Sequence, residues 1–222
     1  MERVRDQTRE GQPEYWERWH TTHDTFDLDI VHKETLELFA DSLGKPPAKV
    51  VELGCGQGYD AVELASRGFL LTAVDLSAVA LRKVRDLANR KSVTLTIKAV
   101  DLSNPPYPWP DSTFDGIYSY LSLHYFDDAM TARIFSEIRR LISPRGVFVF
   151  TVRSIKDPLF GRGLNIGPNL YRSNDHVRHF FTIPYLMTLL ANWHIEQIDE
   201  LTGHYTNPSY NDSLIRVVAH AK

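Results

Sequence analysis

Three glycines at alternate positions follow a short apolar run in the first third of the chain. The stretch VVELGCGQGYDAVELASRG, residues 50–68, places Gly54, Gly56 and Gly58 between a predicted buried strand and a predicted helix. Glycine lets a backbone approach a ligand closely, and the amino end of the next helix presents unpaired N–H groups with a partial positive charge. The stretch therefore predicts a binding loop for a ligand that carries an anionic group.

Part of this loop also fits a dinucleotide pattern. From Gly56 onward, GQGYDA satisfies G-x-G-x-x-G/A, and Asp75 lies at about the distance expected of a ribose-binding acid. Counted from Gly54, however, the spacing is G-x-G-x-G, and Tyr59 stands where the dinucleotide loop needs its third glycine. The register therefore disfavours a nicotinamide-dependent oxidoreductase, which stays an alternative.

Acidic residues lie at the ends of three predicted strands. Glu52 lies two residues before the first glycine, Asp75 ends the second strand, and Asp101 ends the third. Because parallel strands end at one edge of a sheet, these acids indicate further polar contacts along the edge that carries the glycine loop.

Apolar runs alternate with one-sided helical patterns, which requires parallel strands with right-handed crossovers and helices on both faces. The sequence thus predicts a doubly wound α/β sheet. Ser77 and Asp127 are predicted helix N-caps. The predicted strands are 48–53, 69–75, 93–101, 114–121, 146–152, 193–202 and 213–221, the last two antiparallel across 207–212, and the predicted helices are 27–44, 60–67, 77–90, 127–142 and 182–193.

Length and composition limit the class of protein. The chain has 222 residues, a formal net charge of −3 and a pI near 6.3, which give no electrostatic reason to expect nucleic acid. A single cysteine, Cys55, excludes an intramolecular disulfide framework. Because no apolar run is long enough to cross a bilayer and the first residues show no signal pattern, we expect a soluble, cytoplasmic protein without a membrane partner. The oligomeric state stays open.

Several motifs together resemble those of class I S-adenosylmethionine-dependent methyltransferases. They are ELGCGQG, Asp75 after the second strand, Asp101 followed by Leu102, WPDSTFDGIYSYLSLHYFDD and LISPRGVFVFTV, and they cover about residues 48–152. The resemblance implies a Rossmann-like seven-stranded sheet of order 3-2-1-4-5-7-6 with strand 7 antiparallel. Within the family the chain looks most like the small-molecule and tellurite-resistance-type branch.

The same resemblance implies S-adenosyl-L-methionine as the cofactor and S-adenosyl-L-homocysteine as the product. Asp75 would accept hydrogen bonds from the ribose hydroxyls and Asp101 one from the adenine amino group, while Glu52 would support the loop near the ammonium end. An N-terminal aromatic segment with Tyr15, Trp16 and Trp19 would form a lid. The predicted cofactor-binding residues are Tyr15, Trp16, Glu52, Gly54, Cys55, Gly56, Gly58, Asp75, Leu76, Asp101, Leu102, Ser119 and Tyr120.

A long segment, residues 153–181, is predicted to be irregular and to overhang the acceptor pocket. Its H-x-x-H pair lacks further ligands of suitable spacing, so we expect no metal site. The predicted catalytic residues are His124, His176 and His179, and the predicted substrate-binding residues are Arg153, Tyr171, Arg178, Tyr205 and Tyr210.

We expect one domain, residues 1–222, that transfers a methyl group to a small-molecule acceptor by in-line displacement. It comprises a helical or lid segment (1–45), a cofactor core (48–152), the 153–181 insertion and a C-terminal helix with two strands (182–222). Two alternatives besides the oxidoreductase remain. NPPY at 104–107 spells the tetrapeptide of DNA amino-methyltransferases, although it precedes the fourth strand instead of ending it, and a module that binds the cofactor without catalysis would show the same core motifs.

Overall fold

The structure is a computed structural model that describes residues 12–23, 30–173, 176–204 and 211–222. Its helices are α1 (Gln12–Thr22), α2 (Ile30–Leu43), α3 (Tyr59–Ser66), α4 (Ala78–Lys91), α5 (Asp128–Leu141) and α6 (Ile183–Leu189). Its strands are β1 (Lys49–Leu53), β2 (Leu70–Asp75), β3 (Thr96–Ala99), β4 (Phe114–Tyr120), β5 (Ile142–Arg153), β6 (Leu164–Gly167), β7 (Leu170–Ser173), β8 (His176–His179), β9 (Trp193–Gly203) and β10 (Asp212–Ala221).

Seven strands form the main sheet in the order β3-β2-β1-β4-β5-β10-β9. The first five pair in parallel, with Val51 of β1 between Thr72 of β2 and Ile117 of β4. β10 is antiparallel to both of its neighbours, β5 and β9. The predicted order and the antiparallel last strand are therefore confirmed.

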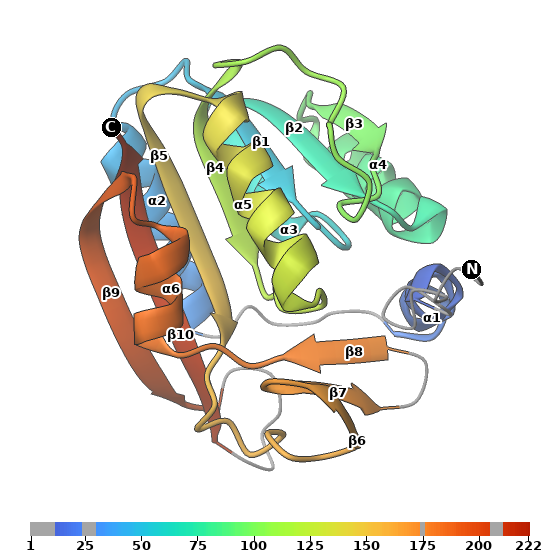
Figure 1. Cartoon of the computed structure of the whole chain (residues 1–222). Coiled ribbons are helices and arrows are strands. Elements are labelled where there is room, and N and C mark those ends of the chain that lie inside the picture. Colours follow the sequence, from blue (N-terminus) through green and yellow to red (C-terminus); the bar gives the residue numbers. More distant parts are fainter. Residues whose placement is uncertain (1–11, 24–29, 174–175, 205–210) are drawn as a thin grey trace.

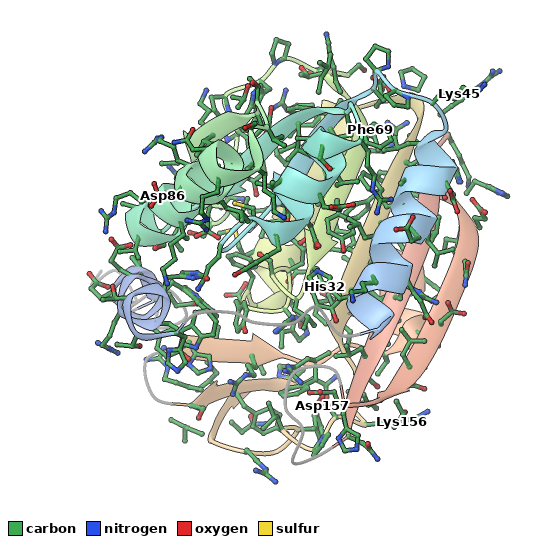
Figure 2. All side chains as sticks on the ribbon, turned by 180° about the vertical axis from the view of Figure 1, so that it is seen from behind. His32, Lys45, Phe69, Asp86, Lys156 and Asp157 are labelled. Atoms are coloured by element: carbon green, nitrogen blue, oxygen red, sulfur yellow. The ribbon has the colours of Figure 1, made fainter. Side chains whose placement is uncertain are left out.

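Helices cover both faces of this sheet (Figures 1 and 2). On one face α2, α3 and α4 pack side chains such as Phe39 and Val84 into one apolar core, and on the other α5 and α6 contribute Ile138 and Leu186 to a second core. Each fully buried aliphatic or aromatic side chain stabilises the fold by about 1.5–3 kcal/mol relative to exposure. The sheet is thus a fixed base for the loops at its carboxyl edge.

Two predicted caps begin the helices that follow β2 and β4. The Ser77 hydroxyl accepts a hydrogen bond from the Ala80 N–H at 3.1 Å, and the Asp127 carboxylate accepts one from the Met130 N–H at 2.7 Å. Both caps are confirmed, and they fix where α4 and α5 leave the carboxyl edge.

The segment predicted to be irregular contains a second sheet, so that prediction is wrong for part of its length. β6, β7 and β8 form an antiparallel sheet of three strands with four residues each. β6 ends at Gly167 and Pro168 follows it, and strands this short show no apolar alternation that a sequence pattern could reveal. Figure 1 shows this small sheet and α1 at the carboxyl edge of the main sheet.

None of the helices in the described ranges has the length and apolar character needed to cross a lipid bilayer.

Candidate functional site

The glycine loop joins β1 to α3 and is tied to β2. The Cys55 N–H donates to the Val74 carbonyl at 2.8 Å. A Cβ on Gly54 (φ +69°) would lie 2.0 Å from Ser122 Oγ, and one on Gly58 (φ +80°) would lie 2.6 Å from a methyl of Val84. Gly54 therefore permits close approach of the loop after β4, whereas Gly58 permits close packing of α4.

Asp75 connects the glycine loop to the end of β2. Its carboxylate accepts hydrogen bonds from the Gly56 N–H and the Ser77 N–H, each at 2.9 Å, and the residue is 8% exposed. A carboxylate oxygen has about two acceptor sites, so each oxygen keeps capacity for a further donor. The loop and the acid thus lie in one polar site, on the same edge of the sheet.

Asp101 follows the neighbouring strand. The Val100 N–H donates to the Asp75 carbonyl at 3.0 Å, which places the end of β3 beside the end of β2. One Asp101 carboxylate oxygen accepts from the Ser103 N–H at 2.9 Å and from the Ser103 hydroxyl at 2.6 Å. Leu76 is half-buried, and Leu102 is buried. Adjacent strands therefore bring the predicted ribose and adenine contacts to one edge.

Tyr107, the last residue of the NPPY tetrapeptide, belongs to the core. It is 3% exposed, and its hydroxyl donates to the Leu102 carbonyl at 2.7 Å. Its N–H donates to the Glu137 carboxylate at 2.6 Å. With its ring buried in this way, Tyr107 cannot stack on a flipped base as the DNA alternative requires.

Buried acids lie behind the glycine loop. Glu52 is 4% exposed, and one of its carboxylate oxygens, Oε2, has no hydrogen-bond partner among the described residues. Burial, and then the charges of Asp60 and Asp75, raise the pKa of Glu52 well above its ordinary value. Asp60 forms a close ion pair with His32, whose ring stacks on Tyr120 at 4.0 Å. Figure 2 shows His32 on α2, facing this part of the carboxyl edge.

Two other residues predicted to bind the cofactor, Ser119 and Cys55, have side chains buried within the protein. The Ser119 hydroxyl donates to the Leu53 carbonyl at 3.0 Å in the interior. Burial raises the pKa of the Cys55 thiol well above its ordinary value, so this thiol is a poor nucleophile. Sequence reasoning missed Asp60 and His32, because their pairing joins α3 to α2 and no local motif marks it.

Helix α1 covers the glycine loop. Glu17 accepts hydrogen bonds from the Ser77 hydroxyl at 2.6 Å and from the Val79 N–H at 3.3 Å. His20 is 5% exposed, and its Cε1 would lie 3.5 Å from a Cβ on Gly56. Burial lowers the pKa of His20, and its Nδ1 has no partner among the described residues. The α1 residues at the loop are therefore Glu17 and His20, which the sequence prediction did not include.

Of the three predicted lid residues, Tyr15 and Trp16 lie in the amino-terminal half of α1 and Trp19 lies beside His20. Tyr15 stacks on His176 of β8 at 4.2 Å, and the Trp16 ring lies 4.6 Å from that of Tyr125. Trp19 stacks on His23 at 4.8 Å. α1 thus spans from the glycine loop to the small sheet, as Figure 1 shows, and the cofactor contacts of Tyr15 and Trp16 stay a prediction.

His124 is the most deeply buried of the predicted catalytic residues. It is 0% exposed, and neither ring nitrogen has a partner among the described residues. Its carbonyl accepts from the His179 N–H at 2.8 Å, which ties the loop after β4 to β8. Burial, and then the charges of Arg153 and Arg178, lower the pKa of His124 well below its ordinary value. His124 is therefore neutral at physiological pH.

Two predicted acceptor-side residues already have charged partners. Arg153 forms ion pairs with Asp157 at 2.7 Å and Asp212 at 2.9 Å, at the end of the molecule where Figure 2 marks Asp157. His179 Nε2 lies 3.2 Å from Asp128, and burial lowers its pKa. These residues are held in place by the protein itself.

Of the remaining substrate candidates, Tyr171 lies opposite Arg178 in the β7–β8 pairing. Tyr205 and Tyr210 lie outside the described residues. Across the described ranges, no group of three His, Cys, Asp or Glu side chains gathers in a way that could hold a metal ion.

Comparisons with known proteins point to one family. Residues 50–146 match the family model described as a methyltransferase domain. A curated relative, the sterol 24-C-methyltransferase of Gibberella zeae, is 28% identical over 127 residues, which is 56% of this chain and 32% of that protein. The alignments cover between 22% and 55% of the lengths of the first curated relatives.

Solved structures share the whole architecture. A 1,6-didemethyltoxoflavin N1-methyltransferase of Burkholderia thailandensis, with bound 1,6-didemethyltoxoflavin and S-adenosylhomocysteine, has a TM-score of 0.72 at 21% identity and covers 94% of this chain and 86% of its own. TehB of Haemophilus influenzae has a TM-score of 0.68 at 14% identity, with coverage of 93% and 67%. At these identities the likeness shows the fold alone. Residues 50–146 thus match a methyltransferase domain, and the chain has the fold of these two solved structures.

Proposed function

We propose that this chain transfers a methyl group from S-adenosylmethionine to a small-molecule acceptor. The observation that carries the proposal is the hydrogen bond at 2.9 Å from the Gly56 N–H to Asp75, because it joins the bare loop to a carboxylate suited to ribose hydroxyls. The domain match over residues 50–146 supports it. We further propose that the chain acts as one domain in the cytoplasm.

The residues present suit this cofactor. Gly56 leaves the loop bare, since the nearest atom to a Cβ there is His20 Cε1 at 3.5 Å, and two buried atoms, Glu52 Oε2 and His20 Nδ1, have no partner among the described residues. Asp75 and Asp101 would hold the two ends of the nucleoside, and Glu52 would face the ammonium end. When bound, the cofactor supplies an electrophilic methyl group on a sulfonium.

The protein's own contribution would be alignment and exclusion of water. α1 closes over the loop through Glu17 and His20, and it reaches the acceptor side through Tyr15. Positioning of two reactants can lower a barrier by on the order of 7–11 kcal/mol, which requires walls rather than a nucleophilic residue. The unreactive Cys55 thiol is consistent with this division of labour.

The 153–181 insertion and the loop after β4 would form the acceptor wall. Neutral His124 can accept a proton if the acceptor must lose one, and His176 and His179 are the other candidates for this role. Arg153 is already paired with two carboxylates, so it would hold the residues around the acceptor in position and would not contact a charge on the acceptor directly.

The test has two arms that separate this function from its alternatives. Calorimetry should detect binding of S-adenosylhomocysteine and not of NAD, because Tyr59 occupies the third glycine position of the dinucleotide loop. A screen of thiols, phenols, amines, carboxylates, chalcogen oxyanions and DNA oligonucleotides, followed by S-adenosylhomocysteine release, should then give turnover with a small molecule. Preferential NAD binding would contradict the proposal, and cofactor binding without any turnover would favour a non-catalytic module.

A further inference from the structure

Arg178 carries a charge for which the described residues provide no counter-ion. Arg153 pairs with Asp157 and Asp212, and His179 lies beside Asp128, but no carboxylate of the described ranges pairs with Arg178. The Arg178 Nε is also buried and has no hydrogen-bond partner there. A partly buried guanidinium without an anion is costly, which indicates a missing anionic partner.

Strand alternation places Arg178 on the face of β8 that carries α1. Side chains two residues apart in a strand share a face, so Arg178 lies on the same face as His176. The His176 ring stacks on Tyr15 at 4.2 Å and lies 6.0 Å from the ring of Tyr125. Arg178 therefore lies on the side of the small sheet that meets α1 and the loop after β4.

His124 provides the second, independent observation. Its ring packs 4.2 Å from that of Tyr125, and both of its nitrogens are buried and have no hydrogen-bond partner among the described residues. Leaving buried polar atoms without a hydrogen bond is costly, and a ligand that bonds to them removes that cost. The His179 N–H donates to the His124 carbonyl at 2.8 Å, so the loop that carries His124 lies beside the strand that carries Arg178.

We infer that Arg178 and His124 together bind an anionic oxygen group, a carboxylate or comparable oxyanion, on an acceptor whose planar part packs against Tyr15 and Tyr125. A guanidinium binds a carboxylate through two parallel charged hydrogen bonds, and a neutral imidazole can donate a third. A neutral acceptor would leave both groups unsatisfied. The inference rests on the proposed function for its biological meaning, but the anion site can be measured by itself.

The experiment measures binding of benzoate and of its neutral analogue benzamide to the full chain, with and without S-adenosylhomocysteine. Benzoate should bind at least about tenfold more tightly than benzamide, which corresponds to about 1.4 kcal/mol. Arg178→Gln should weaken benzoate at least about tenfold and leave the dissociation constant of S-adenosylhomocysteine unchanged. Arg178→Lys should recover part of the loss, because it restores the charge without the fork.

Arg162→Gln is the matched control, since Arg162 is exposed in the same insertion and loses the same charge. Benzoate that binds no better than benzamide, or equal losses in R178Q and R162Q, would overturn the inference. If R178Q does not fold, the NMR shift of the His124 ring on benzoate addition to the wild-type chain decides instead: no shift contradicts the site. Failure to bind S-adenosylhomocysteine would contradict the proposed function but not the anion site.

Discussion

The proposed cofactor side and the proposed acceptor side lie at the same edge of the sheet but satisfy their polar groups differently. Asp75 accepts from two backbone N–H groups, and Ser119 donates to a backbone carbonyl. On the acceptor side, both nitrogens of His124 and the Nε of Arg178 have no partner in the described part of the chain. The proposed cofactor side is thus assembled largely by backbone hydrogen bonds, although Glu52 Oε2 and His20 Nδ1 have no partner among the described residues, whereas the proposed acceptor side leaves atoms of an imidazole and a guanidinium without partners.

This difference explains why a sequence motif can predict one side of the proposed site and not the other. The backbone hydrogen bonds of the proposed cofactor side depend on glycines and strand ends at fixed spacing, which a sequence motif contains. Side chains that contact an acceptor must match the chemistry of that acceptor, so no single motif describes them. Four measurements test this difference between the two sides.

The largest expected effect comes from Gly58→Ala. The residue has φ +80°, and a Cβ would meet Val84 at 2.6 Å, so strain and overpacking should lower the free energy of unfolding by about 2–4 kcal/mol. Gly161→Ala is the control, because Gly161 has φ +79° with open space around it and should lose only about 1–2 kcal/mol. Equal losses in urea unfolding would show that α4 does not constrain the loop.

Asp75→Asn should weaken S-adenosylhomocysteine binding by roughly 10- to 150-fold, because it replaces a charged acceptor by an amide that faces N–H donors. Calorimetry measures the effect. Asp86→Asn, on the exposed surface of α4 (Figure 2), removes the same charge and should leave the affinity unchanged. An unchanged dissociation constant in D75N would remove Asp75 from the cofactor site.

Glu52→Gln should stabilise the protein at neutral pH. Burial raises the pKa of Glu52 in the folded state. When the pH rises above the ordinary pKa of glutamate, the unfolded chain therefore releases a proton that the folded protein still holds. The stability of the wild-type protein then falls as the pH rises. The gain should be about 1–3 kcal/mol at pH 8 and vanish near pH 4, where both states are protonated. Urea unfolding at the two pH values measures it, and an equal gain at both would exclude proton linkage.

The smallest effect concerns the docking of α1. The hydrogen bond from Ser77 is the main cause that lowers the pKa of Glu17, so this contact is present above the ordinary glutamate pKa and is lost as the pH falls through the lowered value. Glu17→Gln should speed hydrogen exchange in α1 by about 2- to 10-fold at pH 7, where the glutamate is charged, and less near pH 4. Exchange that is unaffected at both values would mean that aromatic contacts alone hold α1.

The sequence pattern predicted the seven strands of the main sheet and both caps, because each depends on local apolar pattern or on one polar residue. The strand order was predicted from the resemblance to the methyltransferase family. The predicted bounds of β3 (93–101) and β5 (146–152) differ from the observed bounds, Thr96–Ala99 and Ile142–Arg153. β5 begins earlier because its pairing with β4 includes Ile142, beyond a register shift between Phe114 and Gly116 that no periodicity marks.

The site was predictable to a similar degree. Glycines and strand-end acids predicted the proposed cofactor side, whereas Glu17 and His20 were not predicted because their contacts depend on where α1 docks. His32 and Asp60 were missed because their pairing is long-range. On the acceptor side the residue types were predicted, while their partners, which decide the role of each, depend on a sheet of four-residue strands.

The small sheet enters and leaves the main domain at neighbouring points. The Phe181 N–H donates to the Arg153 carbonyl at 2.8 Å, and the Ile155 N–H donates to the Phe181 carbonyl at 3.0 Å. A segment with such closely spaced ends can be exchanged for another of different length without moving the strands that flank it. A different acceptor preference could therefore be introduced by replacing the segment between Arg153 and Phe181 as one unit, while the strands that carry the proposed cofactor site stay unchanged.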